Sequence, residues 1–373
     1  MVPVTRFLTH SGIWKLGGTA FTGARGLQTS AVNRKVKGDG SDIVLIDGVR
    51  TPFLLAGTDY ASLMPHDLAR EALLGLVART GIEKSIVDYI SFGTVIQEVK
   101  TSNIAREAAL GAGFSDRTPA HTVTMACISS NQAITTCMGY IRDGVYDVCV
   151  AGGVEFMSDV PIRLSRKLRA MLLKMNKMKT VQQKLSLLST FRPGFLAPEL
   201  PAISEFSSQE TMGHSADRLA AAFEVSRQEQ DEFAMRSHKA ADDAQSKGYL
   251  SDLVPVKIPG KDIYATRDNG VRISTKEQMA KLKPAFVKPF GTITAANASF
   301  LTDGASACLI TSEKTAKKLG LKPKAYLTEF VYVSQDPVDQ LLLGPAYAVP
   351  NVLKRAGLKF SDIDVWEIHE AFA

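Results

Sequence analysis

The chain is poor in cysteine, has no acidic residue near its N-terminus and contains no long apolar run. Its four cysteines are Cys127, Cys137, Cys149 and Cys308, and none of them belongs to a Cys-x-x-Cys pair. This spacing predicts neither a disulfide framework nor a zinc site. No apolar run approaches the roughly 18 residues that a transmembrane helix requires. The sequence therefore points to a reducing compartment and away from disulfide-rich secreted and membrane-spanning proteins.

Residues 1–38 contain six basic residues and no acidic residue. Because the whole chain has a net charge of +6, the remainder is neutral, and its charge gives no reason to expect a nucleic-acid partner. A segment that carries Arg, lacks acids and is rich in Ser, Thr and Gly is typical of a mitochondrial transit peptide. We expect its removal between Leu27 and Arg34. A disordered basic tail is the alternative.

Short apolar strands alternate with amphipathic helices through the first part of the chain. The pattern predicts a strand and loop at 42–53, strands at 90–94, 121–126 and 147–152, and helices over 64–80, 103–110 and 128–142. Such alternation favours an α/β fold with a largely parallel, buried sheet. It stops between residues 160 and 290, where we expect an inserted lid or loop domain. Ser226 and Glu229 form a capping box for a helix that ends at Gly248.

Cys127 stands between a strand and a helix, and this place suits a nucleophile. Backbone N–H groups and the macrodipole at a helix N-terminus favour the thiolate over the thiol. Thiols in such places titrate at roughly 3.5–7.5 instead of about 8.5. A buried structural cysteine is the alternative, since that is the usual fate of this residue type.

A weak internal repeat links the two ends of the chain. Five positions recur at a constant offset, with Arg79, Gly81, Ile82, Val87 and Asp88 matched by Arg355, Gly357, Leu358, Ile363 and Asp364. In both copies a helix ends at glycine, and a strand then leads to a polar loop. The pattern favours a duplicated half, with chance similarity as the alternative.

Residues 162–192 contain nine Lys or Arg residues and no acid. An apolar stripe recurs on one helical face of this segment, formed by Leu164, Leu168, Met171, Met175 and Met178. Basic charge opposite such a stripe favours contact with an anionic membrane surface or with a partner's groove. A helix docked on its own core is the alternative.

Seven ordered blocks of the chain resemble the thiolase family. They are RTPF at 50–53, GTVIQ at 93–97, NIAREAAL at 103–110, the segment around Cys127, AGGVEFMS at 151–158, KLKPAF at 281–286 and GTITAANASFLTDGASA at 291–307. The resemblance implies two similar βαβαβαββ halves in five layers, with an inserted loop domain. The implied division is a leader at 1–38, a first half at 39–158 plus 286–315, a loop domain at 159–285 and a partial second half at 316–373.

The resemblance also implies an activity and the residues that carry it. A thiolase cleaves 3-ketoacyl-CoA with CoA, here long-chain substrates of mitochondrial β-oxidation, through an acyl-enzyme at Cys127. His369, in HEAFA, stands where most thiolases have the Asn that helps to stabilise the enolate. Arg272 matches a CoA nucleotide contact, and Ser299 lies beside the pantetheine arm. His214, in the loop domain, has no proton-transfer role. The reaction needs no metal or cofactor, and CoA is a substrate.

Family members with this basic insertion imply particular partners. We expect a homodimer, a hydratase/dehydrogenase α-subunit and peripheral contact with the mitochondrial inner membrane through 162–192. Two other functions remain open. One is a decarboxylating condensing enzyme that uses the same cysteine, although GGVEFMS and HEAFA fit degradative thiolases better. The other is a catalytically silent form that acts only in subunit or membrane assembly.

Two family motifs are missing from the 373 residues. There is no Gly-His-Pro, whose histidine deprotonates the nucleophile in thiolases, and no Cys-x-Gly-Gly-Gly, whose cysteine protonates the enolate. We expect a C-terminally truncated form, and predict that residues 1–373 alone show little or no thiolysis. Cleavage of 3-ketohexadecanoyl-CoA by the purified polypeptide, followed by absorbance, checks this. A rate typical of thiolases would contradict it.

Overall fold

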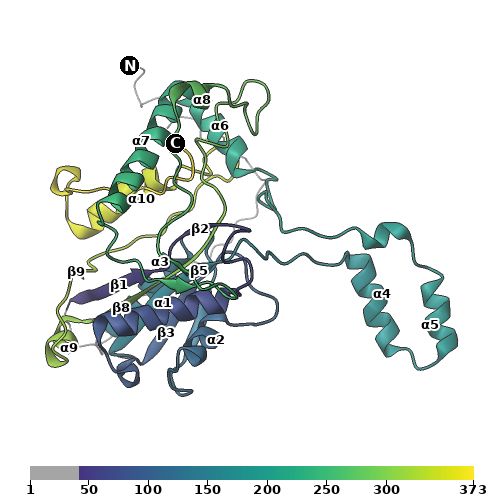
Figure 1. Cartoon of the computed structure of the whole chain (residues 1–373), viewed down its shortest axis with the longest axis horizontal. Helices are drawn as coiled ribbons and strands as arrows, with labels where there is room; N and C mark the ends of the chain where they lie inside the picture. The colour runs from purple at the N-terminus through teal and green to yellow at the C-terminus, as the bar shows by residue number, and fades with distance from the viewer. Residues whose placement is uncertain (1–41) are drawn as a thin grey trace, which may run out of the picture. The chain divides into compact units, whose positions relative to one another are not determined.

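The computed structural model describes residues 42–373, so the predicted transit peptide lies outside the described residues. A seven-stranded sheet has the order β4-β3-β5-β8-β1-β9, and β2 pairs with β8 (Figure 1). The strands are β1 (Ile43–Arg50), β2 (Leu54–Leu55), β3 (Tyr89–Gly93), β4 (Ala120–Val123), β5 (Val148–Glu155), β8 (Thr302–Ser312) and β9 (Ala325–Tyr326). The strands predicted before residue 155 are all present.

The sheet is mixed, so the prediction of a largely parallel sheet was wrong. Strand β3 runs parallel to β4 and β5, but β8 lies antiparallel between β5 and β1. A strand that follows a single crossover helix is held parallel by that connection. Strand β8 instead follows the long inserted segment between β5 and residue 302. This connection does not force β8 to run parallel to β5.

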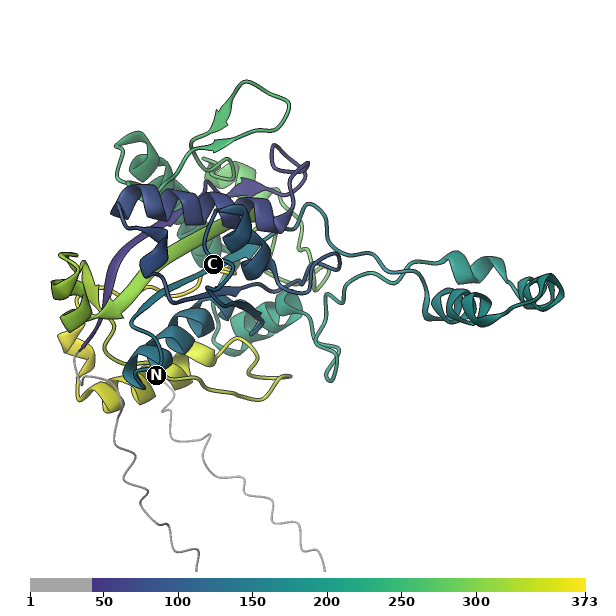
Figure 2. The ribbon, with the colours of Figure 1, turned by 90° about the horizontal axis from the view of Figure 1, so that it is seen from below.

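Helices cover both faces of the sheet. Helices α1 (Pro65–Thr80) and α2 (Ile104–Gly111) belong to one apolar cluster, and α3 (Ser129–Arg142) belongs to a second. Figure 2 shows the sheet between α1 and α3. Strand β5 alternates between the clusters, with Val148 and Val150 in the first and Cys149 and Ala151 in the second. This period of two explains why the strand is apolar along its whole length.

The segment between β5 and β8 is mainly helical. It contains α4 (Arg166–Lys177), α5 (Val181–Leu188), η3 (Pro193–Leu196), α6 (Met212–Ala222), α7 (Arg227–Ser246), β6 (Val256–Lys257), β7 (Tyr264–Ala265) and α8 (Lys276–Ala280). The capping box is confirmed, because the Glu229 N–H donates to Ser226 Oγ at 3.2 Å and the Ser226 N–H donates to Glu229 Oε2 at 2.8 Å. Helix α7 is joined to the segment before β8 where Asn297 Nδ2 donates to Asp231 Oδ1 at 2.9 Å.

The two copies of the sequence repeat share the helix end and the turn that follows it, but the strand predicted in the second copy is absent. Strand β3 (Tyr89–Gly93) follows the first turn, whereas residues 363–370 form no strand and are mostly exposed. Helix α1 ends at Gly81 with φ of 67°, and α10 (Gly344–Ala356) ends at Gly357 with φ of 68°. Only glycine enters this left-handed region without strain. A 3₁₀ turn follows in both copies, η2 (Lys84–Ile86) and η4 (Phe360–Asp362). Helix α9 (Glu313–Lys318) and strand β9 lie between the copies in sequence.

The basic segment forms two short helices, and its predicted apolar stripe is divided. Helix α4 packs against α5 and η3, and it buries Leu168 and Met171. Leu164 and Met178 lie outside the helix. The large exposed apolar side chains of 162–192 are Leu164 of the predicted stripe and six others outside it, namely Ile162, Leu172, Leu173, Val181, Leu185 and Leu188. None of the helices described between residues 42 and 373 is long and apolar enough to cross a membrane.

Two glycines allow α3 to begin close to the sheet. A Cβ at Gly93, the last residue of β3, would lie 2.2 Å from the carbonyl carbon of Ser129. A Cβ at Gly153, in β5, would lie 1.9 Å from Ser130 Oγ. The blocks GTVIQ and AGGVEF therefore need glycine where the first turn of α3 contacts the strands.

We predict that Gly93→Ala lowers the free energy of unfolding by about 1–3 kcal/mol, because the new methyl group overlaps the backbone of α3. Gly139→Ala, in the same helix, is the matched control, since nothing lies within 4 Å of its added Cβ. The control is expected to stabilise the protein by about 0.5–1 kcal/mol. Urea unfolding measures both. Equal stability of Gly93→Ala and the unsubstituted protein would refute the close approach.

Candidate active site

Cys127 lies on a tight turn between β4 and α3. The preceding residue, Ala126, has a φ of 46°, a left-handed conformation that is uncommon for a residue with a side chain. The Ile128 N–H donates to the carbonyl of Met125 at 3.2 Å, and the Ser129 N–H donates to that of Ala126 at 3.2 Å. The turn leaves Cys127 exposed directly before α3.

Ser129 fastens this turn to the loop after β3. Its hydroxyl accepts the Met125 N–H at 2.8 Å, and lies 3.1 Å from the carbonyl oxygen of Thr94 and 2.6 Å from that of Ala126. Ser129 is buried, so these contacts are shielded from water. The turn that carries Cys127 is therefore held at both of its ends.

Cys127 and His369 line the same cavity, which has a volume of about 560 Å³. Much of its lining is apolar and comprises Phe53, which precedes β2, and residues at or near the ends of β3, β5 and β8, namely Val95, Val154, Met157, Phe300 and Leu301. The cavity thus joins a thiol and an imidazole inside a largely apolar wall. This is the pairing that the sequence predicted.

Backbone contacts place the turn that carries His369. The Ser299 N–H donates to the carbonyl of Ala371 at 2.9 Å, and the Ala373 N–H donates to that of Asn297 at 3.0 Å. The Ser237 hydroxyl of α7 donates to Glu370 Oε2 at 2.6 Å. Residues 369–373 are therefore attached to the segment before β8 and to the inserted helices.

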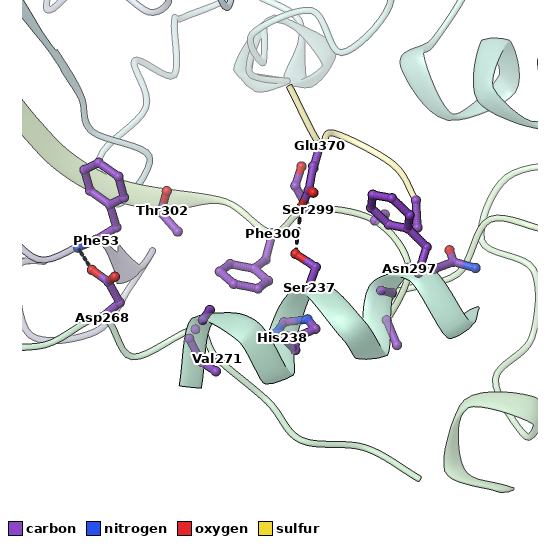
Figure 3. A pocket seen from close by; sticks show the side chains of 17 residues that line it. Phe53, Ser237, His238, Asp268, Val271, Asn297, Ser299, Phe300, Thr302 and Glu370 are labelled. Atoms are coloured by element: carbon purple, nitrogen blue, oxygen red, sulfur yellow. Dashed lines mark hydrogen bonds between the residues drawn. The ribbon is translucent and has the colours of Figure 1, made fainter. Parts of the chain in front are cut away.

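A second cavity, of about 340 Å³, lies next to the first (Figure 3). It is lined by Ser299, Ser237, His238 and Glu370 among apolar side chains. The two cavities share three lining residues, which are Phe53, Phe300 and Thr302. A ligand that extended from one cavity into the other would contact these shared residues.

Arg272 lies beside the smaller cavity without being one of its lining residues. Its guanidinium donates to the carbonyl of Ala295 at 3.2 Å and lies 5.7 Å from the centre of the Phe300 ring. The side chain is exposed, so its charge is available to an anionic group at the mouth. His214 lies elsewhere, on α6, and lines another cavity with Glu210 and Asp217.

Glu155, a carboxylate in the Cys127 cavity, was not predicted from the sequence. Its oxygens accept the N–H groups of Val95 at 2.7 Å and Ile96 at 3.1 Å, which holds the loop after β3 over the cavity. Burial raises the pKa of this carboxyl, although the two N–H donors oppose the shift. The signal was an acid at the end of an otherwise apolar strand, in VCVAGGVE.

The other three cysteines belong to the core, where Cys137 and Cys149 are buried and Cys308 is partly buried against the same cluster. A hydrogen bond with Cys149 and burial together raise the pKa of the Cys137 thiol. Burial raises the pKa of the Cys308 thiol to about 12. Cys127 is the exposed member of the four. Within residues 42–373, no group of three or more His, Cys, Asp or Glu side chains could hold a metal ion.

Known proteins similar to this chain identify its family. The sequence profile "Thiolase, N-terminal domain" matches residues 43–314, and "Thiolase, C-terminal domain" matches residues 321–373. The bovine mitochondrial trifunctional enzyme subunit beta is 67% identical over 93% of this chain and 73% of its own length. A probable 3-ketoacyl-CoA thiolase of Caenorhabditis elegans is 56% identical over 95% of this chain and 78% of its own length.

Solved structures agree with these matches. The acetyl-CoA acetyltransferase of Bacillus anthracis aligns with a TM-score of 0.78 and 33% identity, over 89% of this chain and 80% of that chain. Human mitochondrial 3-ketoacyl-CoA thiolase aligns with a TM-score of 0.78 and 29% identity over the same shares. The predicted thiolase fold is confirmed, and the chain belongs to the thiolase family of acyltransferases.

Proposed function

We propose that the protein takes part in thiolytic cleavage of long-chain 3-ketoacyl-CoA by CoA, with Cys127 as the nucleophile. The observation that carries this proposal is the single cavity lined by Cys127 and His369. Its apolar lining suits a fatty acyl chain, and the exposure of Cys127 leaves the sulfur open to a substrate. Membership of the thiolase family supports the same reaction.

The proposed chemistry has two steps. The Cys127 thiolate attacks the 3-keto carbonyl, the Cα–Cβ bond breaks, and its electron pair forms the enolate of acetyl-CoA. A proton converts the enolate to acetyl-CoA, and the thiolate of a second CoA then takes the acyl group from Cys127. Cysteine suits this exchange because it is both a strong nucleophile and a good leaving group.

His369 is proposed to stabilise the negative oxygen that develops during bond cleavage. A neutral imidazole donates one hydrogen bond, and a donor already facing the oxygen needs little reorganisation. Loss of a single such donor costs about 10²–10³ in rate in enzymes where this has been measured. The backbone contacts that hold the turn of residues 369–373 support this role, because they fix the position of the backbone that carries the imidazole.

We assign the smaller cavity to CoA. Ser299 lines it and is proposed to lie beside the pantetheine arm, while Arg272 at its edge is proposed to contact the nucleotide. A guanidinium is planar and permanently charged, so it suits both phosphate and adenine contacts. No metal or cofactor takes part in this proposal, and CoA acts as a substrate.

Cellular context is proposed from the relatives. Several of them are named as the beta subunit of a mitochondrial trifunctional enzyme. We therefore propose a mitochondrial matrix location, a homodimer and an α-subunit partner with hydratase and dehydrogenase activities.

Alkylation by iodoacetamide tests the nucleophile. Cys127 is expected to react at least tenfold faster than the three core cysteines, because it is exposed, whereas Cys137 and Cys149 are buried and Cys308 is partly buried. A long-chain acyl-CoA is expected to slow that reaction by filling the cavity. Peptide mass spectrometry follows each site, and Cys127→Ser is the control that removes the fast phase. Slow labelling that acyl-CoA leaves unchanged would favour the catalytically silent assembly role.

The helical pair α4–α5 supports a second proposal, peripheral contact with the inner membrane. Exposed Leu172, Leu173 and Leu185 stand among the nine basic residues of 162–192. Apolar side chains enter the headgroup region while Lys and Arg attract anionic lipid. The buried Leu168 and Met171 are excluded from this surface, because they pack inside the segment.

Flotation with anionic liposomes tests this contact. Deletion of residues 163–192 is expected to reduce lipid-bound protein at least fivefold, and Leu172→Ser combined with Leu173→Ser is expected to reduce it without removing the charge. An unchanged iodoacetamide rate at Cys127 verifies that the site persists. Binding to anionic lipid that survives the deletion would remove the proposal.

A further inference from the structure

Glu155 binds the backbone of the loop after β3 at the point where β3 leaves the sheet. The parallel ladder between β3 and β5 ends at the pair Gly93 and Gly153, but β5 continues to Glu155. The carboxylate accepts the N–H of Val95 at 2.7 Å on one oxygen and that of Ile96 at 3.1 Å on the other. Successive N–H groups of an extended strand point to opposite sides. Because one carboxylate accepts both groups here, the backbone is bent between them.

The same loop is joined on its other side to the turn that carries Cys127. The carbonyl oxygen of Thr94 accepts the hydroxyl of Thr124 at 3.0 Å and lies 3.1 Å from that of Ser129. These contacts fix the loop at Thr94. The two residues that follow have their N–H groups on Glu155, so the carboxylate determines where this part of the loop lies relative to β5.

The chemistry of this contact requires a carboxylate. Glu155 is half-buried, and within residues 42–373 its partners are the two N–H groups and no Lys or Arg. Burying a charge costs free energy, which hydrogen bonds to the charged group offset. An amide of the same size accepts at one oxygen only and would turn its own NH₂ group toward the other N–H. The position of the loop therefore depends on this one side chain.

The loop contributes an apolar side chain to the wall of the larger cavity. Val95 is exposed, and it lines the cavity together with Cys127 and Glu155. If the loop is released, only a fraction of the molecules has Val95 in place at any time. The apparent affinity for a ligand that contacts this wall then falls by the same fraction.

We propose that Glu155 is a positioning residue, which sets the acyl-chain wall of the cavity by holding Val95 in place. This assignment rests on the proposed function, which puts the acyl chain beside Cys127. Glu155 acts through the loop and needs no contact with the substrate. It therefore affects affinity for the alkyl part of the ligand, and not for the CoA part that we assign to the smaller cavity.

Protection of Cys127 from iodoacetamide measures the two parts separately. The probes are S-hexadecyl-CoA, a thioether that carries an alkyl chain and no transferable acyl group, and desulfo-CoA, which carries neither chain nor thiol. Glu155→Gln is expected to raise the concentration of S-hexadecyl-CoA that halves the alkylation rate by about three- to tenfold, the effect of one lost hydrogen bond. The half-protecting concentration of desulfo-CoA is expected to stay the same.

A double-variant cycle shows whether Glu155 acts through Val95. Val95→Ala is expected to weaken protection by S-hexadecyl-CoA about two- to fivefold, because it removes methyl groups from the wall. Because both substitutions alter the same wall, the combined variant is expected to lose less than the product of the two single losses.

The matched control is Asp88→Asn. Asp88 Oδ2 also accepts two successive N–H groups, those of Asp147 and Val148 at 2.9 Å each, but at the start of β5 and outside both cavities. Its substitution is expected to leave protection by both probes unchanged.

Three results would each overturn the assignment: unchanged protection by S-hexadecyl-CoA in Glu155→Gln, equal losses for the two probes, or independent losses in the cycle. Absence of protection of the unsubstituted protein by either probe would overturn the proposed function, and this assignment with it. Thermal unfolding verifies the fold of each variant. Should Glu155→Gln not fold, Glu155→Asp keeps the charge, shortens the reach to the loop and gives the same comparison.

Discussion

The close approach of α3 to the sheet is the constraint on which the site depends. Gly93 and Gly153 leave no side chain between the strand ends and the first turn of the helix. Ser129 then fastens that turn to the loop after β3. Because protein interiors are close-packed, a single added carbon at either glycine would displace the helix start. The position of Cys127 is thus set by residues that take no part in chemistry.

Helix α7 of the inserted segment also supports the site. Helix α7 contributes Ser237 to Glu370 and Asp231 to Asn297, so it contacts both the turn of residues 369–373 and the segment before β8. These contacts join parts of the chain that are far apart in sequence. The insertion is therefore a structural support of the active site.

Local sequence patterns predicted the structural features that depend on neighbouring residues. Periodicity predicted the helices and strands before residue 155, and the capping box predicted the start of α7, because neighbouring residues determine both features. The pairing of Cys127 with His369 came from family resemblance. The direction of β8 and the contacts of Glu155 were missed. The direction of β8 depends on a strand that returns after a long insertion, and Glu155 binds backbone groups about 60 residues away, so no local pattern records either feature.

The two cavities have Phe53 and Phe300 in common in their linings. Phe53 and Phe300 each rest on a glycine, Gly304 and Gly270, and each ring lies near an arginine, Arg50 for Phe53 and Arg272 for Phe300. Rings seated in this way have little room to turn. Because each ring lines both cavities, a small molecule in the smaller cavity that displaced a ring would also change the shape of the Cys127 cavity, and an inhibitor of this protein need not touch Cys127.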